Sequence, residues 1–288
     1  MNNLKTAVLL AVLTGLLMAV GALFGGRSGM TIMFVMSMLM NFVSYWYSDK
    51  IVLSMYGARE VTATDAVDLL RMVAGLAQKA NLPMPKVYIM DTEVPNAFAT
   101  GRDPEHSAVA VTTGIMRSLK SNELEGVLAH ELGHIKHRDT LISTVVASVA
   151  GVITMIAHIA QWSAFFGFGR SDDEDNGFAG IIEMVFLIVL APLAATLIQM
   201  GISRSREYLA DEAGGKFSGS PLALAQALEK IEYFAKNQVL PEATPATSHM
   251  FIINPFSGSK SNMMSLFSTH PATADRISRL KEQAKRMK

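Results

Sequence analysis

The segment HELGH at residues 130–134 carries side chains that can do chemistry, at a spacing that brings them together. Just upstream, Asn122 and Glu125 form a candidate capping box, so the segment is predicted to lie on a helix. Successive helical residues turn by about 100°, so His130 and His134 share one face, where both imidazoles can reach a single zinc ion. Glu131 lies beside them and can act as a general base toward a zinc-activated water, then pass the proton to a leaving amine. The predicted chemistry is hydrolysis of a peptide bond.

A catalytic zinc needs a third protein ligand, and because the chain contains no cysteine this ligand must offer nitrogen or oxygen. We predict that the chain enters a membrane after Arg138 and leaves it before Arg204, through two helices of about 30 Å each. Both ends then return to a similar depth, and Glu207, three residues after Arg204, is the predicted third ligand. Asp211, one turn further, can accept the second ring N–H of a zinc histidine and fix its tautomer. The alternative for Asp211 is an ordinary helix-surface carboxylate.

The composition is that of a membrane protein. Half of the 288 residues are apolar, 17% are charged and the mean hydropathy is +0.29, whereas soluble domains carry roughly 25% charged residues. The 25 basic and 25 acidic side chains cancel, which argues against a nucleic-acid partner. The lack of cysteine also excludes disulfides and thiol catalysis.

Four apolar stretches are long enough to cross a bilayer, at residues 6–24, 30–47, 140–160 and 184–203. They predict a mainly α integral membrane protein with four transmembrane helices. The predicted divisions are an N-terminal transmembrane hairpin (1–47), the first half of a catalytic domain (48–139), a second hairpin (140–203) and the second half of that domain (204–288). Lys and Arg gather on the side of the catalytic domain, which is therefore predicted to be cytoplasmic. Two alternatives are buried core helices for all four stretches and a cleaved signal peptide at residues 1–22.

The remaining sequence has ordinary soluble patterns. An amphipathic helix is predicted at residues 65–80 and short strands at 86–90 and 107–113, whereas NAFATG at residues 96–101 is predicted to be a turn. A helix is also predicted from Ser220 and Pro221, with Leu222, Ala225, Leu228 and Ile231 on its buried face.

Two other functions compete with a surface-bound peptidase. An intramembrane protease also uses HExxH, but it would bury the motif in a span, whereas Lys136, Arg138 and Asp139 flank the motif here. A membrane scaffold with a chance HExxH would require Glu207 and Asp211 to be coincidental. Both are weaker interpretations than a membrane-anchored metalloprotease.

Several motifs together resemble those of the HtpX-type heat-shock membrane proteases, which are relatives of the CAAX prenyl endopeptidases. These motifs are the two-span start, NAFATG at 96–101, HELGH at 130–134, SRSREYLAD at 203–211 and THP at 269–271. The resemblance implies a gluzincin-like α+β zinc protease domain at the cytoplasmic face of a bacterial inner membrane. It also implies one zinc ion held by His130, His134 and Glu207, with Glu131 as the base. The implied role is quality control and stress response, with misfolded or damaged membrane proteins as substrates and the lipid bilayer as surroundings.

The same resemblance assigns further residues to the site. Residues 96–100 and the strand at 107–113 should line the cleft, with Asn96, Ala97, Phe98 and Ala99 binding an extended substrate by strand addition. His270 and Arg276 match positions that face the zinc and stabilise the oxyanion; a loop histidine and a helix-surface arginine are the alternatives. Because the chain is shorter than the prenyl endopeptidases and has fewer spans, no prenyl-cysteine specificity is expected. Functional overlap with other membrane quality-control proteases is expected instead.

Overall fold

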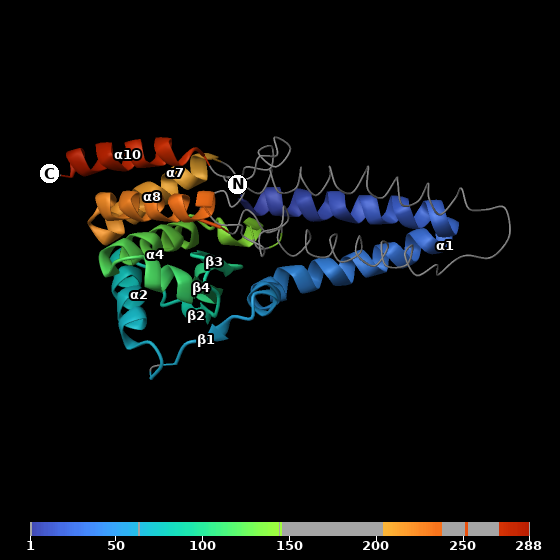
Figure 1. The fold of residues 1–288 in the computed structure, drawn as a ribbon. Helices are drawn as coiled ribbons and strands as arrows, with labels where there is room; N and C mark the ends of the chain where they lie inside the picture. Colours follow the sequence, from blue (N-terminus) through green and yellow to red (C-terminus); the bar gives the residue numbers. More distant parts are fainter. Residues whose placement is uncertain are drawn as a thin grey trace.

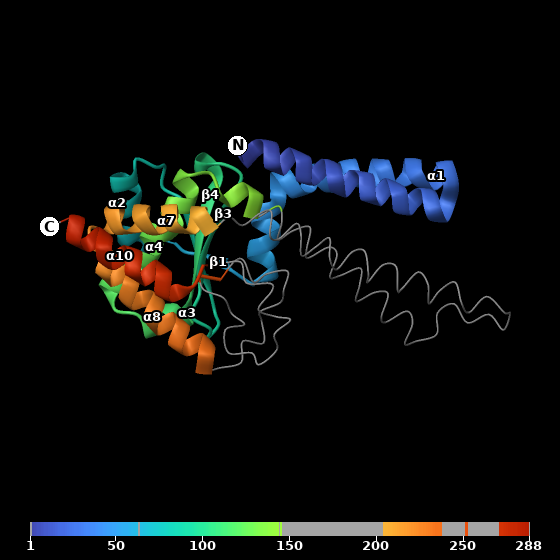
Figure 2. The ribbon, with the colours of Figure 1, turned by 90° about the horizontal axis from the view of Figure 1, so that it is seen from above.

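A helical hairpin extends away from a body built of one sheet and several helices (Figures 1 and 2). The computed structural model describes residues 2–62, 64–143, 145, 204–237, 251–252 and 271–287. The predicted third and fourth spans, at residues 140–160 and 184–203, lie almost wholly outside the described residues. Four transmembrane helices are therefore still a prediction.

The hairpin is α1 (Asn2–Met55), which reverses direction at Gly26. Gly26 has φ 55° and ψ −139°, a backbone conformation that is strained for any residue with a Cβ. The two halves lie close together, since Asn41 Nδ2 donates a hydrogen bond of 2.9 Å to Thr14 Oγ1. The reversal falls between the first two predicted spans. Among the described residues, the stretch Gly25–Tyr47 is the one that is long and apolar enough to cross a membrane.

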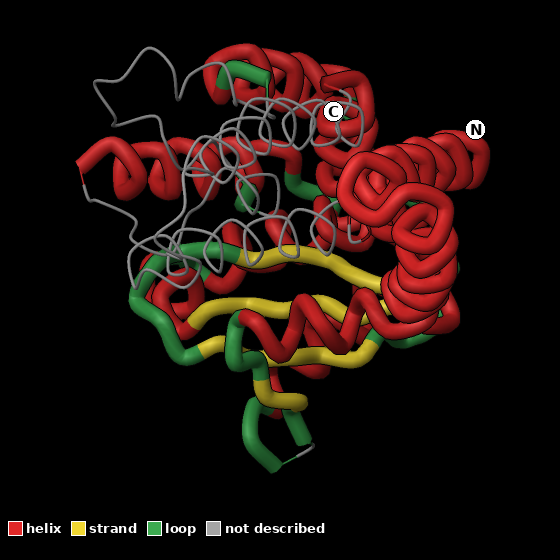
Figure 3. Tube along the Cα trace, turned by 90° about the vertical axis from the view of Figure 1, so that its right-hand side faces the viewer, coloured by secondary structure: helices red, strands yellow, loops and turns green. Residues whose placement is uncertain are grey.

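The sheet lies beside the C-terminal end of α1, and Figure 3 shows its strands side by side. Its strands run in the order β1-β2-β4-β3, with β2 and β4 parallel and the outer two antiparallel to their neighbours. The strands are β1 (Arg59–Glu60), β2 (Lys86–Met90), β3 (Ala97–Gly101) and β4 (Ser107–Thr112). Two predicted strands are confirmed, and the prediction of a turn at residues 96–101 is wrong. β4 is central, buried and paired on both sides, so it cannot itself pair with an added strand, and its place beside a substrate cleft stays a prediction.

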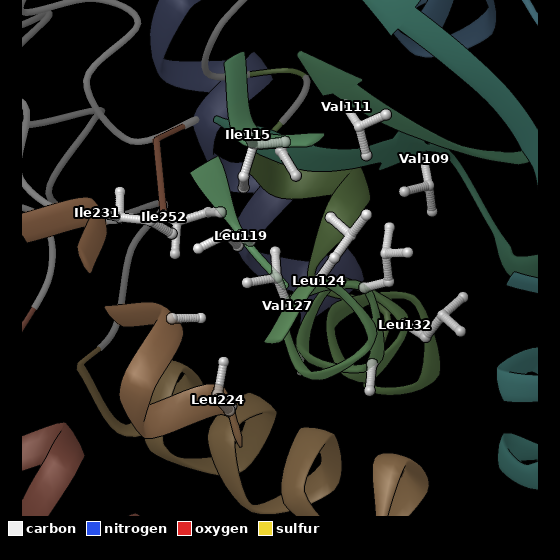
Figure 4. Packing of buried hydrophobic residues seen from close by; sticks show 14 of the residues in the cluster. Val109, Val111, Ile115, Leu119, Leu124, Val127, Leu132, Leu224, Ile231 and Ile252 are labelled. Carbon is white, nitrogen blue, oxygen red and sulfur yellow. The ribbon is translucent and has the colours of Figure 1, made fainter. Parts of the chain in front are cut away.

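Helices cover the sheet, and one of them is central to the body. The helices beyond the hairpin are α2 (Val67–Ala80), the 3₁₀ turn η1 (Pro104–His106), α3 (Thr113–Ser118), α4 (Ser121–Lys136), α7 (Arg204–Ser218), α8 (Pro221–Asn237) and α10 (Thr273–Arg286). Figure 4 shows the core between them, where Leu124, Val127 and Leu132 of α4 belong to one cluster with residues of the sheet and of α8. α4 thus carries the HELGH segment through the middle of the body.

The ends of three helices test the sequence predictions. Helix α2 ends at Ala80, as predicted, and its C-cap residue Asn81 adopts the left-handed conformation (φ 51°) that suits asparagine. Helix α4 begins with Glu123, not Glu125, as its capping carboxylate, because Glu123 accepts the main-chain N–H of Lys120 at 2.8 Å. Helix α8 is confirmed, but Leu222 is 43% exposed and lies off the buried face.

The buried Glu123 carboxylate also binds the ammonium group of Lys230 on α8, at 2.6 Å. Burial alone would raise the pKa of Glu123, but the hydrogen bonds from Lys230 and from the Lys120 main chain hold it below its usual value. This contact ties the start of α4 to α8.

Two glycines allow α4 and α7 to approach closely. A Cβ at Gly214 would lie 3.0 Å from Cα of His130, and a Cβ at Gly133 would lie 3.1 Å from Cα of Ala210. Small residues at such a crossing let the two backbones come together. The glycine within HELGH therefore has a packing function, and the close crossing brings His130 toward the helix that carries Glu207.

Candidate metal centre

The three predicted ligands lie together at the crossing of α4 and α7. Nε2 of His130 is 3.2 Å from Nε2 of His134, and Glu207 oxygens lie 3.4 Å from His134 Nε2 and 3.9 Å from His130 Nε2. In a tetrahedral zinc site with bonds of about 2.0–2.1 Å, neighbouring ligand atoms are roughly 3.3 Å apart. All three ligand atoms lie within 4.8 Å of one another. The spacing and the nitrogen and oxygen donors fit zinc.

The charge around these ligands also fits a cation. Burial would lower the pKa of His134, but the carboxylates of Glu207, Asp139 and Glu131 together raise it to about 9. An imidazole that takes up a proton so readily lies in a strongly negative potential. A divalent cation gains from the same potential, so the site is electrostatically prepared for one.

Glu131 lies beside the ligands and is held by the sheet. Its Oε2 accepts the main-chain N–H of Ala99 at 2.8 Å. The residue is 5% exposed, and burial raises the pKa of its carboxyl group. The general base predicted from HExxH is thus fixed in direction by β3, a strand that sequence patterns failed to identify.

Asp211 and Arg276 form a buried pair behind His130. Oδ1 of Asp211 lies 2.9 Å from Nδ1 of His130, and the carboxylate takes two hydrogen bonds from Arg276, at 2.7 and 2.8 Å. Burial opposes ionisation of Asp211, but Arg276 lowers its pKa to about 2. The structure therefore places Asp211 where the sequence argument expected it, against a histidine ring.

Arg276 is fully buried, which excludes a helix-surface position for it. Besides the Asp211 carboxylate, its guanidinium donates to the main-chain oxygen of Ile252 at 2.7 Å and lies 3.7 Å from Glu207. The carboxylates of Asp211, Glu207 and Glu131 together outweigh the cost of burial and raise the pKa of Arg276 above its usual value. With these partners the guanidinium orients Asp211, and the predicted oxyanion role stays a prediction.

Sequence reasoning missed Asp139. Its carboxylate is buried, with Oδ2 at 3.4 Å from Nδ1 of His134 and Oδ1 at 3.6 Å from Arg206. The chain turns back at Arg138, whose φ of 57° is uncommon for a residue with a side chain, and Asp139 N–H donates to the carbonyl of His134 at 2.9 Å. Each histidine thus has a carboxylate at its second nitrogen, an arrangement that fixes metal-ligand orientation. The one available signal was an acidic residue five positions after His134.

The four residues predicted to bind substrate differ in how far their side chains are exposed. The side chains of Ala97 and Phe98 are 1% and 3% exposed and belong to the core. Asn96 is equally buried, and its Oδ1 accepts the main-chain N–H of Ile252 at 3.2 Å. Among these four residues, Ala99 alone has a half-buried side chain, and the role of all four in substrate binding stays a prediction. His270 lies outside the described residues.

Comparison with known proteins gives the family. Residues 63–284 match Peptidase family M48. The Protease HtpX homolog of Sulfurihydrogenibium sp. (strain YO3AOP1) is 54% identical over 291 residues, covering 99% of this chain and 97% of that protein. The Protease HtpX homolog of Pyrococcus furiosus is 54% identical over 283 residues, covering 98% and 96%.

A solved structure supports the fold. The crystal structure of S. mikatae Ste24p superposes with a TM-score of 0.52 at 18% identity, covering 97% of this chain and 64% of that one. At this identity the likeness concerns the fold alone. The match to the family over most of the chain and the identity to its relatives show that this protein belongs to Peptidase family M48, the zinc-dependent metalloproteases of the HtpX type.

Proposed function

We propose that this metalloprotease is an endopeptidase of the cytoplasmic membrane that cleaves misfolded or damaged membrane proteins, with its catalytic domain facing the cytoplasm. The observation that carries the proposal is the convergence of His130, His134 and Glu207 with Glu131 beside them. The candidate span at Gly25–Tyr47 and the relatives named Protease HtpX homolog support a membrane-associated enzyme. Residues 48–139 and 204–288 would form the catalytic domain.

His130, His134 and Glu207 would hold the zinc ion, which supplies a Lewis acid that polarises the scissile carbonyl and activates water. Glu131 would take a proton from the attacking water at its carboxylate and pass it to the leaving amine. Because burial raises the pKa of Glu131, its carboxylate is a stronger base than an exposed one. Asp211 and Asp139 would orient the two histidine rings.

An extended substrate segment would add to the sheet beside β3. β3 is an edge strand of the described sheet. One of its edges is paired with β4, and its other edge faces away from the sheet. The N–H of Ala99 points away from β4 to Glu131, so the general base lies along the outer edge of β3. A peptide paired to that edge would pass directly in front of the base, which supports the proposed strand addition.

The motif lies outside the membrane hairpin, which disfavours intramembrane proteolysis. Helix α4 packs on α7, α8 and the sheet, within the body and away from the tip of α1 (Figure 2). A substrate segment must therefore leave the bilayer to reach Glu131. Unfolded or dislocated parts of membrane proteins meet this requirement.

A zinc determination combined with a cleavage assay tests the proposal. The detergent-purified chain should contain one zinc ion, and Glu207→Ala should lose it while Glu212→Ala, on the exposed side of the same helix, should keep it. The zinc-loaded enzyme should cleave a destabilised membrane protein faster than its folded form. Full zinc retention by Glu207→Ala would refute the ligand set, and equal cleavage of both substrates would refute the proposed substrate class.

A further inference from the structure

The C-terminal part of α1, where the helix reaches the catalytic body, borders a cavity that the peptidase chemistry does not use. Along Gly25–Tyr47 the apolar side chains are unusually exposed, with Ile32, Val35 and Leu39 each more than half accessible. Such an apolar surface is expected to face lipid. The stretch ends in Tyr45, Trp46 and Tyr47, residue types that favour the membrane–water interface.

Asp49 and Lys50 are the first charged residues after Arg27 in this half of α1, and one residue, Ser48, separates them from the aromatic group. The interface between hydrocarbon and water is therefore expected near residues 45–50. At this level, the end of α1, β2, the β3–β4 connection and the start of β4 line an open cavity of about 660 Å³. Its volume lies within the range of roughly 300–1,000 Å³ that is usual for small-ligand sites.

Aromatic and basic groups are already combined in the wall of this cavity. The guanidinium carbon of Arg102 lies 4.6 Å from the centre of the Trp46 ring, and Nζ of Lys50 lies 5.3 Å from the centre of the Tyr47 ring. Stacking holds the Arg102 side chain at the cavity, where it is only partly exposed. Lys50 and Arg102 both line this cavity, and both carry N–H donors of the kind that bind a phosphate diester.

The wall is nevertheless not a simple anion site. It also contains the carboxylates of Asp49 and Glu105, for which the described part of the chain provides no ion pair within 4 Å. Two of the wall's cations already have carboxylate partners outside it: Nζ of Lys86 lies 3.1 Å from Glu60, and Nε of Arg102 lies 3.4 Å from Asp103. Lys50 and the terminal nitrogens of Arg102 are therefore left to face the carboxylates of Asp49 and Glu105, an arrangement that suits a ligand with one charge of each sign.

We propose that this cavity binds the headgroup of a zwitterionic aminophospholipid from the surrounding bilayer. Lys50 and Arg102 bind the phosphate, Asp49 and Glu105 bind the ammonium group, and the acyl chains lie along the exposed apolar face of α1. A lipid in this position fixes the depth of the catalytic body against the membrane. The inference rests on membrane association and is independent of the proposed substrate and of the peptide-bond chemistry.

Native mass spectrometry of the full chain in a nonionic detergent tests this site. The purified protein is mixed with phosphatidylethanolamine or with phosphatidylglycerol, and the retained lipid is counted. The wild-type chain should retain one phosphatidylethanolamine in preference to phosphatidylglycerol. Removal of both cations by Lys50→Gln with Arg102→Gln should lower retention by about tenfold.

A matched control removes the same charge elsewhere. Arg71 and Arg117 have side chains that are 77% and 65% exposed and lie outside the cavity, so Arg71→Gln with Arg117→Gln should retain lipid as the wild type does. Asp49→Asn should shift the preference toward phosphatidylglycerol, and it decides the matter if the Lys50 and Arg102 variant does not fold. Absence of retained phosphatidylethanolamine, preference of the wild type for phosphatidylglycerol, or equal loss in the control would each overturn the proposal.

Discussion

Replacement of Asp139 by asparagine should weaken zinc binding without unfolding the protein. The substitution keeps the size of the side chain but removes the negative charge that faces Nδ1 of His134. An amide in this position can also present its NH₂ group to the ring and favour the wrong tautomer. His134 would then hold a metal less firmly, although its position on α4 would not change.

The geometry sets the size of the effect. Loss of a carboxylate behind a zinc histidine typically costs 10- to 100-fold in metal affinity. The Asp139 contact, at 3.4 Å, is long for a hydrogen bond, whereas Asp211 lies 2.9 Å from His130. We therefore expect Asp139→Asn to lie near the lower limit, with a loss of about tenfold, or about 1.4 kcal/mol.

Competition with a chromophoric chelator measures this affinity on the purified chain. Asp68→Asn is the control, because its side chain is 98% exposed on α2 and it makes the same change of charge. The zinc-free Asp139→Asn protein should keep the circular dichroism spectrum of the control, although the loss of its buried charge contact with Arg206 should lower its thermal midpoint. An unchanged zinc dissociation constant for Asp139→Asn would refute the role given to this carboxylate.

Three further substitutions probe the packing and charge around the site. Gly214→Ala should lower stability by about 1–3 kcal/mol, because its Cβ would crowd His130, whereas Gly75→Ala, which has open space, should raise stability by up to about 1 kcal/mol; thermal unfolding compares the two. Since the folded-state pKa of Glu123 is lowered, its stabilisation is complete above the unfolded value and is lost as the pH falls through the folded value. Zinc-free wild-type protein should therefore lose stability below about pH 4.5 more steeply than Glu123→Gln, and parallel curves would contradict the assignment. Arg276→Lys should lower the thermal midpoint of the zinc-free protein, because lysine cannot reproduce the two-pronged contact with its carboxylate partner; an unchanged midpoint with a reduced turnover would instead favour the oxyanion role.

Local sequence patterns were enough to place the centre of the site. The spacing of His130 and His134 is a property of one helix, and helical periodicity alone puts both on one face. Glu207 could be reached because the return of the chain from a membrane hairpin constrains its depth. The structure brings these three residues together, and their role as ligands awaits the zinc measurements.

The residues that sequence patterns missed depend on contacts distant in the chain. Residues 96–101 form a strand only because β4 pairs with them, and their Asn and Gly suggested a turn. Asp139 reaches His134 through the left-handed backbone of Arg138, which nothing in its residue type predicts. Arg276 lies on a strongly polar helix, and only its pairing with Asp211 allows its complete burial.

Zinc content and cleavage measured together on Glu131→Gln test the central claim most directly. The substitution keeps the side-chain shape and leaves all three proposed ligands in place, so one zinc ion per chain should be retained. Cleavage of an unfolded protein substrate should fall by at least about 10²-fold, because the amide cannot accept the proton from water. If Glu131→Gln cleaved as fast as the wild type with its zinc in place, the assignment of the general base and of the peptidase site would be wrong.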